Sequence, residues 1–548
     1  MLLFLLSLIV NAKEPSDDMI KKMIGQMLVV GFDSQVIIYH SRIVEDIEAY
    51  NLGGVILFDR FYNNRARVKN ILSPYQLRNL LNKFQKITKK PFFISIDQEG
   101  GSVARLKKRD GFLQTPSAQQ MAKLTKKEAT FLYDRQSKML RDLGINLNFA
   151  PVVDLASNPK NRVIVGLQRA YSDDVSEVVE NASILIESQK KHHIVSVLKH
   201  FPGHGSSMRD SHKGFVDISD TWSSEELKPY MKLIAEGEAD VIMTAHVFNS
   251  HIDSKYPATL SYLCNTTLLR EKMGFTGLII SDDMQMGALT KHYSLKERVT
   301  LAINAGVNIL LFGNQLQHNS VSEIVETIFE EVKNGNISLK KIEESNQKIK
   351  NLHTKYSIVQ KPILFGDKRK YLTKKYIKKH YQLDVKNIKI TPKIVVVHWT
   401  AVMSFEKSFE RLNAELLFSD RADIASASAL NVSSHFLVDR DGTIYQLMPD
   451  NWMARHVIGL NYSSIGIENV GGEANKKEDL TPQQLEANIR LIEYLKSKYP
   501  SIENVIGHYE YRDFEGSSLW LEKDAGYRTQ KVDPGVNFMY NLREALVQ

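Results

Sequence analysis

From residue 20 to about 350, short apolar runs alternate with longer stretches of helical periodicity. This alternation is typical of a parallel sheet whose strands are joined by crossover helices. Eight such runs, with helices between them, favour an α/β fold of the (β/α)8 TIM-barrel type over an open doubly wound sheet. The predicted strands are Met27 to Phe32, Gly54 to Phe58, Phe92 to Asp97, Leu147 to Asp154, Val195 to Phe201, Val241 to His246, Gly277 to Asp282 and Val307 to Phe312.

The pattern changes after Leu352, where the alternation stops and a basic stretch follows. A new apolar run begins at Ile394, and two hairpin-like strands, Ser434 to Val438 and Thr443 to Leu447, flank an Asp-Gly turn. A capping box and one apolar face predict a helix from Thr481 to Lys498. We therefore predict a second, smaller α+β domain.

Length and composition agree with two folded domains. A chain of 548 residues exceeds the ~300 residues at which a single core stops growing. With 43% hydrophobic and 24% charged residues, it is not mainly disordered, collagenous or a polytopic membrane protein. We place the first domain at residues 20–352, a basic linker at 353–384 and the second domain at 385–548.

The net charge of +8 comes from one segment. Residues 361–390 contain ten Lys and Arg residues against two Asp residues, which equals the whole excess. Such a run is usually a solvated face or a linker, and attraction to an anionic polymer such as cell wall is the alternative. We expect no nucleic-acid partner.

A single cysteine, Cys264, excludes an intramolecular disulfide and a multi-cysteine zinc cluster, and we interpret it as a packing residue. The apolar run from Leu2 to Val10 is too short to span a bilayer, and Val10-Asn11-Ala12 suits signal peptidase. We predict a signal peptide at residues 1–12, a periplasmic or secreted protein and no transmembrane segment in the mature chain. The alternative is a buried N-terminal strand in a cytoplasmic protein.

Polar residues gather where the predicted barrel strands end, which is where barrel enzymes build their active sites. They are Asp97, Asp154, Lys199, His200, His246, Asp282 and Asp283. By itself the run from Lys199 to Gly205 fits a metal site or a core as well as a catalytic loop. The spacing of Asp210 and His212 allows the carboxylate to orient the imidazole as an acid/base, and Asp282 supplies a carboxylate nucleophile.

Four motifs follow one another in an order that resembles the β-N-acetylglucosaminidases of glycoside hydrolase family 3. They are Asp97-Gln98-Glu99-Gly100-Gly101, Asn148 to Asp154, Lys199 to Gly205 with Asp210-Ser211-His212, and Ser281-Asp282-Asp283-Met284. The resemblance implies a retaining mechanism without a cofactor, with Asp282 as nucleophile, His212 as acid/base and Asp210 as its orienting partner. It also implies that sugar is bound by Asp97, Arg105, Arg169, Lys199 and His200.

Alternatives remain for several of these residues. Arg169 stands one residue further from the preceding glycine than the family pattern has it, and Arg105 and Arg169 could form loop salt bridges. We expect Asp154 to cap a strand end and Asp283 to be structural. A phosphorylase, which uses phosphate instead of water as acceptor, is the alternative reaction for this domain.

In the second domain His398 ends an apolar strand, Gly507-His508 follows another, and Asp533 lies near the C-terminus. Two imidazoles and one carboxylate leave a tetrahedral zinc ion one open position. Residues 385–548 resemble the type 2 N-acetylmuramoyl-L-alanine amidases, a zinc fold with a central mixed sheet. The resemblance is carried by His398, Ser434 to Gly442, Ser464 to Glu468, Gly507-His508 and Lys531 to Gly535.

This second resemblance implies that His398, His508 and Asp533 bind Zn²⁺, that Glu468 is the general base and that Lys531 stabilises the oxyanion. His456 matches a substrate-contacting histidine, with a surface histidine as the alternative. The loop between His508 and Asp533 is longer than the family pattern has it, and we expect it either to narrow the groove or to re-aim it, which affects substrate size and not metal binding.

Together the two resemblances predict a bifunctional hydrolase. One domain removes terminal N-acetylglucosamine from muropeptides, and the other cleaves the bond between N-acetylmuramic acid and L-alanine. The expected partners are peptidoglycan fragments or the cell wall. The alternative from another class is a wall-binding protein in which one or both domains are not catalytic.

Overall fold

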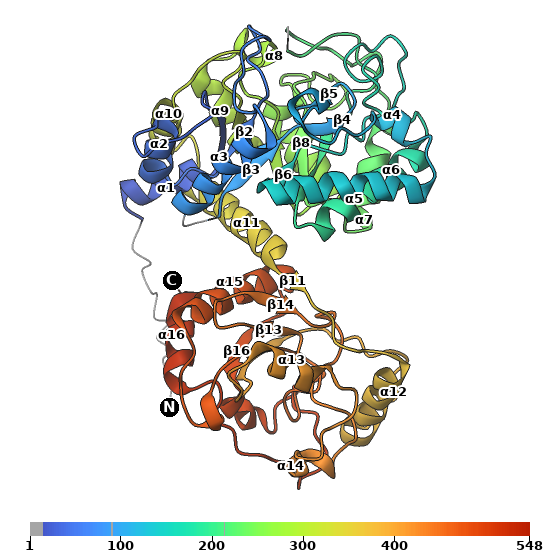
Figure 1. The fold of residues 1–548 in the computed structure, drawn as a ribbon, viewed down its shortest axis with the longest axis vertical. Helices are drawn as coiled ribbons and strands as arrows, with labels where there is room; N and C mark the ends of the chain where they lie inside the picture. Colours follow the sequence, from blue (N-terminus) through green and yellow to red (C-terminus); the bar gives the residue numbers. More distant parts are fainter. Residues whose placement is uncertain (1–14, 89–90, 213, 548) are drawn as a thin grey trace, which may run out of the picture. The chain divides into compact units, whose positions relative to one another are not determined.

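The computed structural model describes residues 15–88, 91–212 and 214–547. This part of the chain divides into two compact units, with the boundary between Leu352 and His353 (Figure 1). The predicted signal peptide, residues 1–12, lies outside the described residues. Of the described helices, none combines the length and the apolar character needed to cross a membrane.

Among the described residues, eight parallel strands form the sheet of the first unit, in the order β10-β1-β2-β3-β6-β7-β8-β9. A parallel bridge between Ile280 of β9 and Ile309, which precedes β10, connects the two ends of this order. The sheet is therefore nearly closed into a barrel. The predicted TIM-type barrel is confirmed. Its strands are β1 (Leu28–Gly31), β2 (Gly54–Leu57), β3 (Phe93–Ile96), β6 (Leu147–Asn148), β7 (Val195–Phe201), β8 (Val241–Thr244), β9 (Leu278–Ser281) and β10 (Leu310–Phe312).

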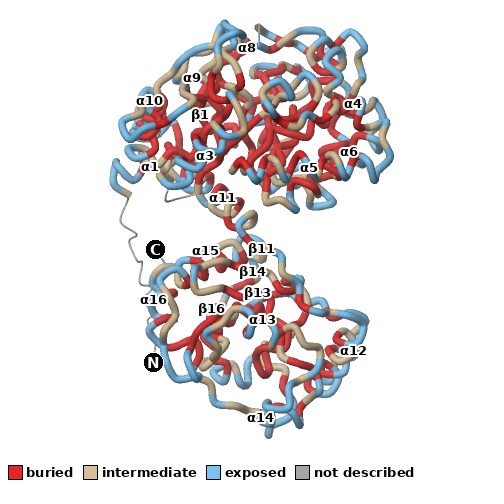
Figure 2. The backbone as a smooth tube through the Cα atoms, in the orientation of Figure 1, coloured by how far each residue is buried: buried red, intermediate tan, exposed pale blue. Residues whose placement is uncertain are grey.

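The strands of this barrel are buried along their whole length, as parallel strands covered on both faces must be (Figure 2). Capping boxes begin three of the surrounding helices, at Ser117 with Gln120, at Thr125 with Glu128 and at Ser294 with Glu297. The helices are α1 (Asp17–Gln26), α2 (Arg42–Tyr50), α3 (Pro74–Ile87), α4 (Ala118–Met121), α5 (Lys126–Leu143), α6 (Val175–Lys191), α7 (Lys228–Ala235), α8 (Gly287–Thr290), α9 (Leu295–Ala305), α10 (Val321–Lys333) and α11 (Leu339–Ser357). A hairpin of β4 (Gln98–Gly100) and β5 (Val103–Ala104) follows β3.

Strand β6 is shorter than the predicted run from Leu147 to Asp154. Pro151 has no N–H to donate and therefore interrupts the hydrogen-bond ladder. The chain continues beside β7 as a loop, in which the amide of Val153 donates to the carbonyl of Lys199 at 2.9 Å. This loop carries Asp154 to the site.

Among the described residues, six strands form a mixed sheet in the second unit, in the order β11-β14-β13-β15-β12-β16. The predicted mixed sheet is confirmed, since β13 and β14 are antiparallel and the other pairs are parallel. The strands are β11 (Val359–Gln360), β12 (Ile394–Trp399), β13 (Phe436–Val438), β14 (Ile444–Gln446), β15 (Ser464–Asn469) and β16 (Asn504–Gly507). The helices are α12 (Asp367–Tyr376), α13 (Phe405–Asn413), α14 (Ala422–Ala425), α15 (Pro482–Lys498) and α16 (Val536–Val547).

Helix α12 and the π-helical turn Ile377–Tyr381 lie in the segment for which the sequence predicts a basic linker. Tyr376, Ile377 and Tyr381 are buried in an apolar cluster of the second unit that also contains Ile394. Most lysines of the segment are exposed. The segment therefore contributes to the core of the second unit, while most of its lysines face solvent.

Candidate active sites

A cavity of about 460 Å³ lies at the carboxyl ends of the barrel strands. The residues predicted for the first site come from the ends of β3, β7 and β9 and from the loops after β3, β6 and β7. All of them line this cavity: Asp97, Arg105, Arg169, Lys199, His200, Asp210, His212 and Asp282. The topology of a barrel explains this convergence, because its parallel strands end at one face.

Two cations hold Asp97 in the cavity wall. Its carboxylate accepts hydrogen bonds from Nζ of Lys199 at 3.0 Å and from Nη2 of Arg105 at 3.0 Å. Burial acts to raise the pKa of Asp97, but the charges of Lys199 and Arg105 outweigh it and hold the pKa well below its usual range. Asp97 is therefore an anionic hydrogen-bond acceptor, the type of group that binds sugar hydroxyls.

Glu99, to which the sequence analysis assigns no role, organises the cations of the same wall. Both of its oxygens accept bonds from Arg169 at 2.8 Å, and Nζ of Lys199 lies 2.6 Å from one of them. The bidentate pair fixes the plane of the guanidinium group. Arg105 and Arg169 thus form the ion pairs considered from the sequence and also line the cavity. The only signal for Glu99 in the sequence is its place two residues after Asp97.

Asp154 does more than cap a strand end. It is fully buried, and its Oδ1 accepts the backbone N–H groups of His200 at 3.1 Å and His204 at 2.8 Å. Its Oδ2 lies 2.6 Å from Nδ1 of His200, and Nε2 of His200 lies 3.2 Å from Nη2 of Arg169. Because arginine can only donate, Nε2 of His200 accepts the hydrogen bond from Arg169. The ring proton is therefore on Nδ1, which donates a hydrogen bond to Asp154. Asp154 therefore fixes the tautomer of a cavity residue.

Asp282 follows β9 directly, and its backbone amide donates to the carbonyl of Thr244 at 3.1 Å. Burial acts to raise the pKa of Asp282, but the charge of His212 and the backbone N–H of Asp283, which donates to Oδ1 at 2.7 Å, act to lower it, and the pKa lies below its usual value. Asp282 is therefore ionised at neutral pH, as a nucleophile must be.

His212 and Asp210 form a hydrogen-bonded pair beside this carboxylate. Nδ1 of His212 lies 2.9 Å from Oδ1 of Asp210, which also accepts the backbone amide of His212 at 3.0 Å. Partial desolvation acts to lower the pKa of His212, but the hydrogen bond that the ring donates to Asp210 and the charge of Asp282 outweigh it and raise the pKa. The pair has the geometry of an oriented acid/base.

Asp283 and His246 support the loop after β9. Asp283 accepts the backbone amides of Gln285 at 3.0 Å and Gly313 at 3.1 Å, and burial raises its pKa to about 6. His246 is buried, with Nε2 2.9 Å from the carbonyl oxygen of Asp283. These contacts agree with the structural role expected for Asp283.

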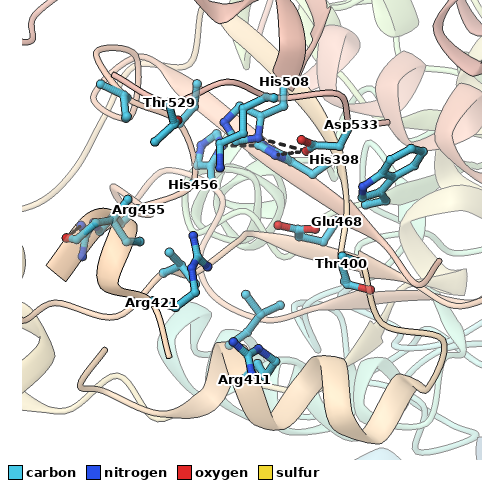
Figure 3. Close-up of a pocket in the computed structure, with 18 of the residues that line it drawn as sticks. His398, Thr400, Arg411, Arg421, Arg455, His456, Glu468, His508, Thr529 and Asp533 are labelled. Carbon is cyan, nitrogen blue, oxygen red and sulfur yellow. Dashed lines mark hydrogen bonds and ion pairs between the residues drawn. The ribbon is translucent and has the colours of Figure 1, made fainter. Parts of the chain in front are cut away.

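A second cavity, of about 390 Å³, lies in the second unit (Figure 3). His398 reaches it from β12, Glu468 from the neighbouring β15, and His508 follows β16. The cavity is lined by all the residues predicted for this site: His398, His456, Glu468, His508, Lys531 and Asp533.

His398, His508 and Asp533 converge on one point. Oδ2 of Asp533 lies 3.2 Å from Nδ1 of His398 and 3.0 Å from Nδ1 of His508, and the three ligand atoms lie within 4.8 Å of one another. Burial lowers the pKa of His508 to about 4, so its imidazole is neutral, the form that binds metals. Two imidazoles and a carboxylate fit the donor set of a catalytic zinc ion.

Glu468 lies beside this trio, because the parallel register of β12 and β15 pairs it with His398. Its Oε2 is buried without a hydrogen-bond partner among the described residues. Burial raises the pKa of Glu468 to about 7. An unpartnered carboxylate with such a pKa is suited to proton transfer.

Other residues complete the wall of the second cavity. Arg411 and Arg421, from the α13–α14 region, line it, as does Tyr527 from the long loop between His508 and Asp533. Arg455 donates to the hydroxyl of Tyr527 at 3.0 Å and so ties this loop to the wall. The sequence analysis does not single out Arg411 or Arg421, because neither lies in a motif.

Comparisons with known proteins match both units. Residues 19–352 match the model of the glycosyl hydrolase family 3 N terminal domain, and residues 389–536 match that of N-acetylmuramoyl-L-alanine amidase. Both resemblances expected from the motifs are thereby confirmed.

The similar curated proteins match about half of the chain. Beta-hexosaminidase A of Pseudoalteromonas piscicida is 34% identical over 284 residues, which are 49% of this chain and 46% of that protein. The beta-hexosaminidase of Haemophilus influenzae is 35% identical over 273 residues, which are 48% of this chain and 73% of that protein.

Solved structures show the same barrel. A glycosyl hydrolase family 3 member from Mycobacterium smegmatis has a TM-score of 0.52 and 27% identity, covering 60% of this chain and 95% of its own. A family 3 beta-N-acetylglucosaminidase from Paenibacillus sp. has a TM-score of 0.56 and 24% identity, covering 89% of this chain and 84% of its own. The second likeness concerns the fold alone.

Proposed function

The chain belongs to glycosyl hydrolase family 3 through residues 19–352, and we propose that it is a bifunctional hydrolase of peptidoglycan fragments. The first unit removes terminal N-acetylglucosamine from muropeptides. The second cleaves the amide bond between N-acetylmuramic acid and L-alanine. The observation that carries this proposal is that each unit has its own cavity, and each cavity contains a full set of groups for one of the two reactions.

In the first cavity, ionised Asp282 attacks the anomeric carbon, and the bond to the departing sugar breaks as the glycosyl ester forms. His212, held by Asp210, donates its proton to the leaving oxygen and then accepts one from the water that cleaves the ester. Asp97, Arg169 and the other wall residues bind the sugar hydroxyls and the acetamido group.

In the second cavity, His398, His508 and Asp533 would hold the zinc ion. A bound zinc ion polarises a carbonyl group and makes water more acidic. Glu468 accepts the proton of the attacking water and passes it to the departing amide nitrogen. Lys531 faces the negative charge that develops on the carbonyl oxygen.

The N-terminal sequence supports a proposal about the cell compartment. We propose export to the periplasm or the medium, with cleavage after Ala12, because a short apolar run precedes a signal-peptidase site. N-terminal sequencing of the protein purified from its own cell tests this proposal. A chain that begins at Met1 in the cytoplasm would refute it and assign the protein to cytoplasmic recycling.

The two activities are tested together by mass spectrometry of a disaccharide-peptide incubated with the purified full-length chain and zinc. We expect free N-acetylglucosamine and free peptide. The same incubation with phosphate separates hydrolysis from phosphorolysis, because a phosphorylase would release the sugar as its 1-phosphate. Absence of both cleavages would favour a wall-binding protein.

A further inference from the structure

His456 lies beside the predicted metal ligand His398 in the wall of the second cavity (Figure 3). Its Nδ1 is 3.0 Å from Nε2 of His398, and its Nε2 is 3.1 Å from Oγ of Ser464. His456 is buried, and its ring nitrogens contact a histidine and a serine instead of a carboxylate that would stabilise a charged ring. A neutral imidazole has one N–H donor and one acceptor nitrogen, so the two contacts must be of opposite kind.

Ser464 determines which nitrogen of His456 carries the proton. Its hydroxyl donates to the carbonyl oxygen of Leu460 at 2.8 Å, so its oxygen accepts the bond from His456. Nε2 of His456 is therefore protonated, and Nδ1 accepts the N–H at Nε2 of His398. This leaves His398 with a lone pair on Nδ1, the nitrogen that lies 3.2 Å from Asp533.

We propose that His456 is a positioning residue, which holds His398 in the tautomer and ring orientation that present its Nδ1 lone pair to the zinc ion. The proposal rests on the zinc site of the proposed function. Ligand histidines commonly donate their second N–H to an acceptor that fixes the ring. Here that acceptor is a second histidine, which is itself fixed by a serine and a backbone carbonyl.

The surroundings hold His456 in this position. Its backbone amide donates to Oδ1 of Asn461 at 2.8 Å, and Asn461 donates to the hydroxyl of Tyr381 at 3.0 Å. Gly466 leaves room for the ring, since a Cβ at this position would lie 2.7 Å from it. Both ring nitrogens are engaged with the protein, so neither is left to bond a substrate, which is the role that the family resemblance suggests.

The test is the affinity of the full-length chain for Zn²⁺, measured by competition with a fluorescent chelator. His456→Leu removes the acceptor and should weaken zinc binding about 10- to 100-fold, the usual loss for such a partner. His456→Asn returns an amide oxygen close to the position of Nδ1 and should restore most of the affinity. Ser464→Ala frees the tautomer of His456 and should cause a smaller loss.

His380→Gln is the matched control. His380 is a buried histidine of the same unit, but it contacts Glu522 and a backbone carbonyl instead of a predicted ligand. This variant should bind zinc like the wild type, and circular dichroism of the metal-free proteins checks that each variant is folded.

Three results would count against His456. A folded His456→Leu protein with wild-type zinc affinity and a raised KM would make His456 a substrate contact. Equal losses in His456→Leu and His456→Asn, or a similar loss in His380→Gln, would indicate a packing defect and overturn the positioning role. A wild-type chain that binds no zinc would instead overturn the proposed metal site itself, and the role of His456 with it.

Discussion

Replacing Asp154 by asparagine tests whether a buried carboxylate affects sugar release, although it is neither the proposed nucleophile Asp282 nor the proposed acid/base His212. The amide keeps the shape of the side chain but exchanges one acceptor oxygen for a donor. Oδ1 must stay an oxygen, because it accepts the backbone amides of His200 and His204. The new NH2 group therefore takes the place of Oδ2 and meets the proton on Nδ1 of His200, 2.6 Å from that position in the wild type.

In the Asp154→Asn protein, both tautomers of His200 place two hydrogen-bond donors against each other. If its proton moves to Nε2, it faces the N–H of Arg169 at 3.2 Å. One buried donor is left without an acceptor in either case, at a cost of ~1–3 kcal/mol. If that cost falls on the transition state, kcat/KM should drop about 5- to 160-fold, at ~1.36 kcal/mol per factor of ten.

The assay is hydrolysis of an aryl N-acetylglucosaminide, with peptide release by the second unit as an internal control that should not change. Asp46→Asn is the matched variant, since Asp46 is buried in α2 away from the cavity, and it should keep wild-type sugar release. Wild-type kcat/KM in a folded Asp154→Asn protein would refute the argument that Asp154 sets the tautomer of His200.

Four further expectations concern the catalytic groups. Asp282→Asn should abolish sugar release but not peptide release, because an amide is a poor nucleophile; a near wild-type rate would remove Asp282 from that role. His212→Ala should harm substrates with good leaving groups less than those with poor ones, and equal losses would contradict its acid role. Asp210 raises the pKa of His212, so Asp210→Asn should lower this pKa and move the alkaline loss of sugar release to lower pH; an unchanged profile would oppose this. A chelator should stop only peptide release, while Asp533→Ala should lose zinc and Glu468→Ala should keep it without turnover; zinc loss in the latter would reject the base assignment.

The barrel was predictable because each of its strands is a separate apolar run, and burial on both faces makes such runs visible in the sequence. The lengths of the strands were harder to predict. Leu147 to Asp154 is apolar enough for a long strand, but Pro151 cannot donate to the ladder, and β6 stops at Asn148. Charge was misleading in another way: α12 is rich in lysine, yet Tyr376 on the same helix is a core residue.

The residues of the candidate sites could be predicted from the sequence motifs. Every residue chosen from the motifs lines the cavity of its unit, since each motif sits at a strand end or in the loop after one. The contacts among these residues were not predictable, because they join distant positions. Glu99 and Arg169 are 70 residues apart, and His398 and His456 are 58 apart. No local pattern records which of the available cations or acceptors a side chain meets.

In both units a buried side chain fixes the tautomer of a histidine that lines the cavity. A histidine in water exchanges its proton between two nitrogens, and only one arrangement suits a given site. In the barrel, Asp154 holds the proton of His200 on Nδ1 and leaves Nε2 to accept from Arg169. In the second unit, His456 holds the proton of His398 on Nε2 and leaves Nδ1 for a metal. The nitrogen facing the site thus differs between the units, and in each it is chosen by a side chain that lies behind the ring.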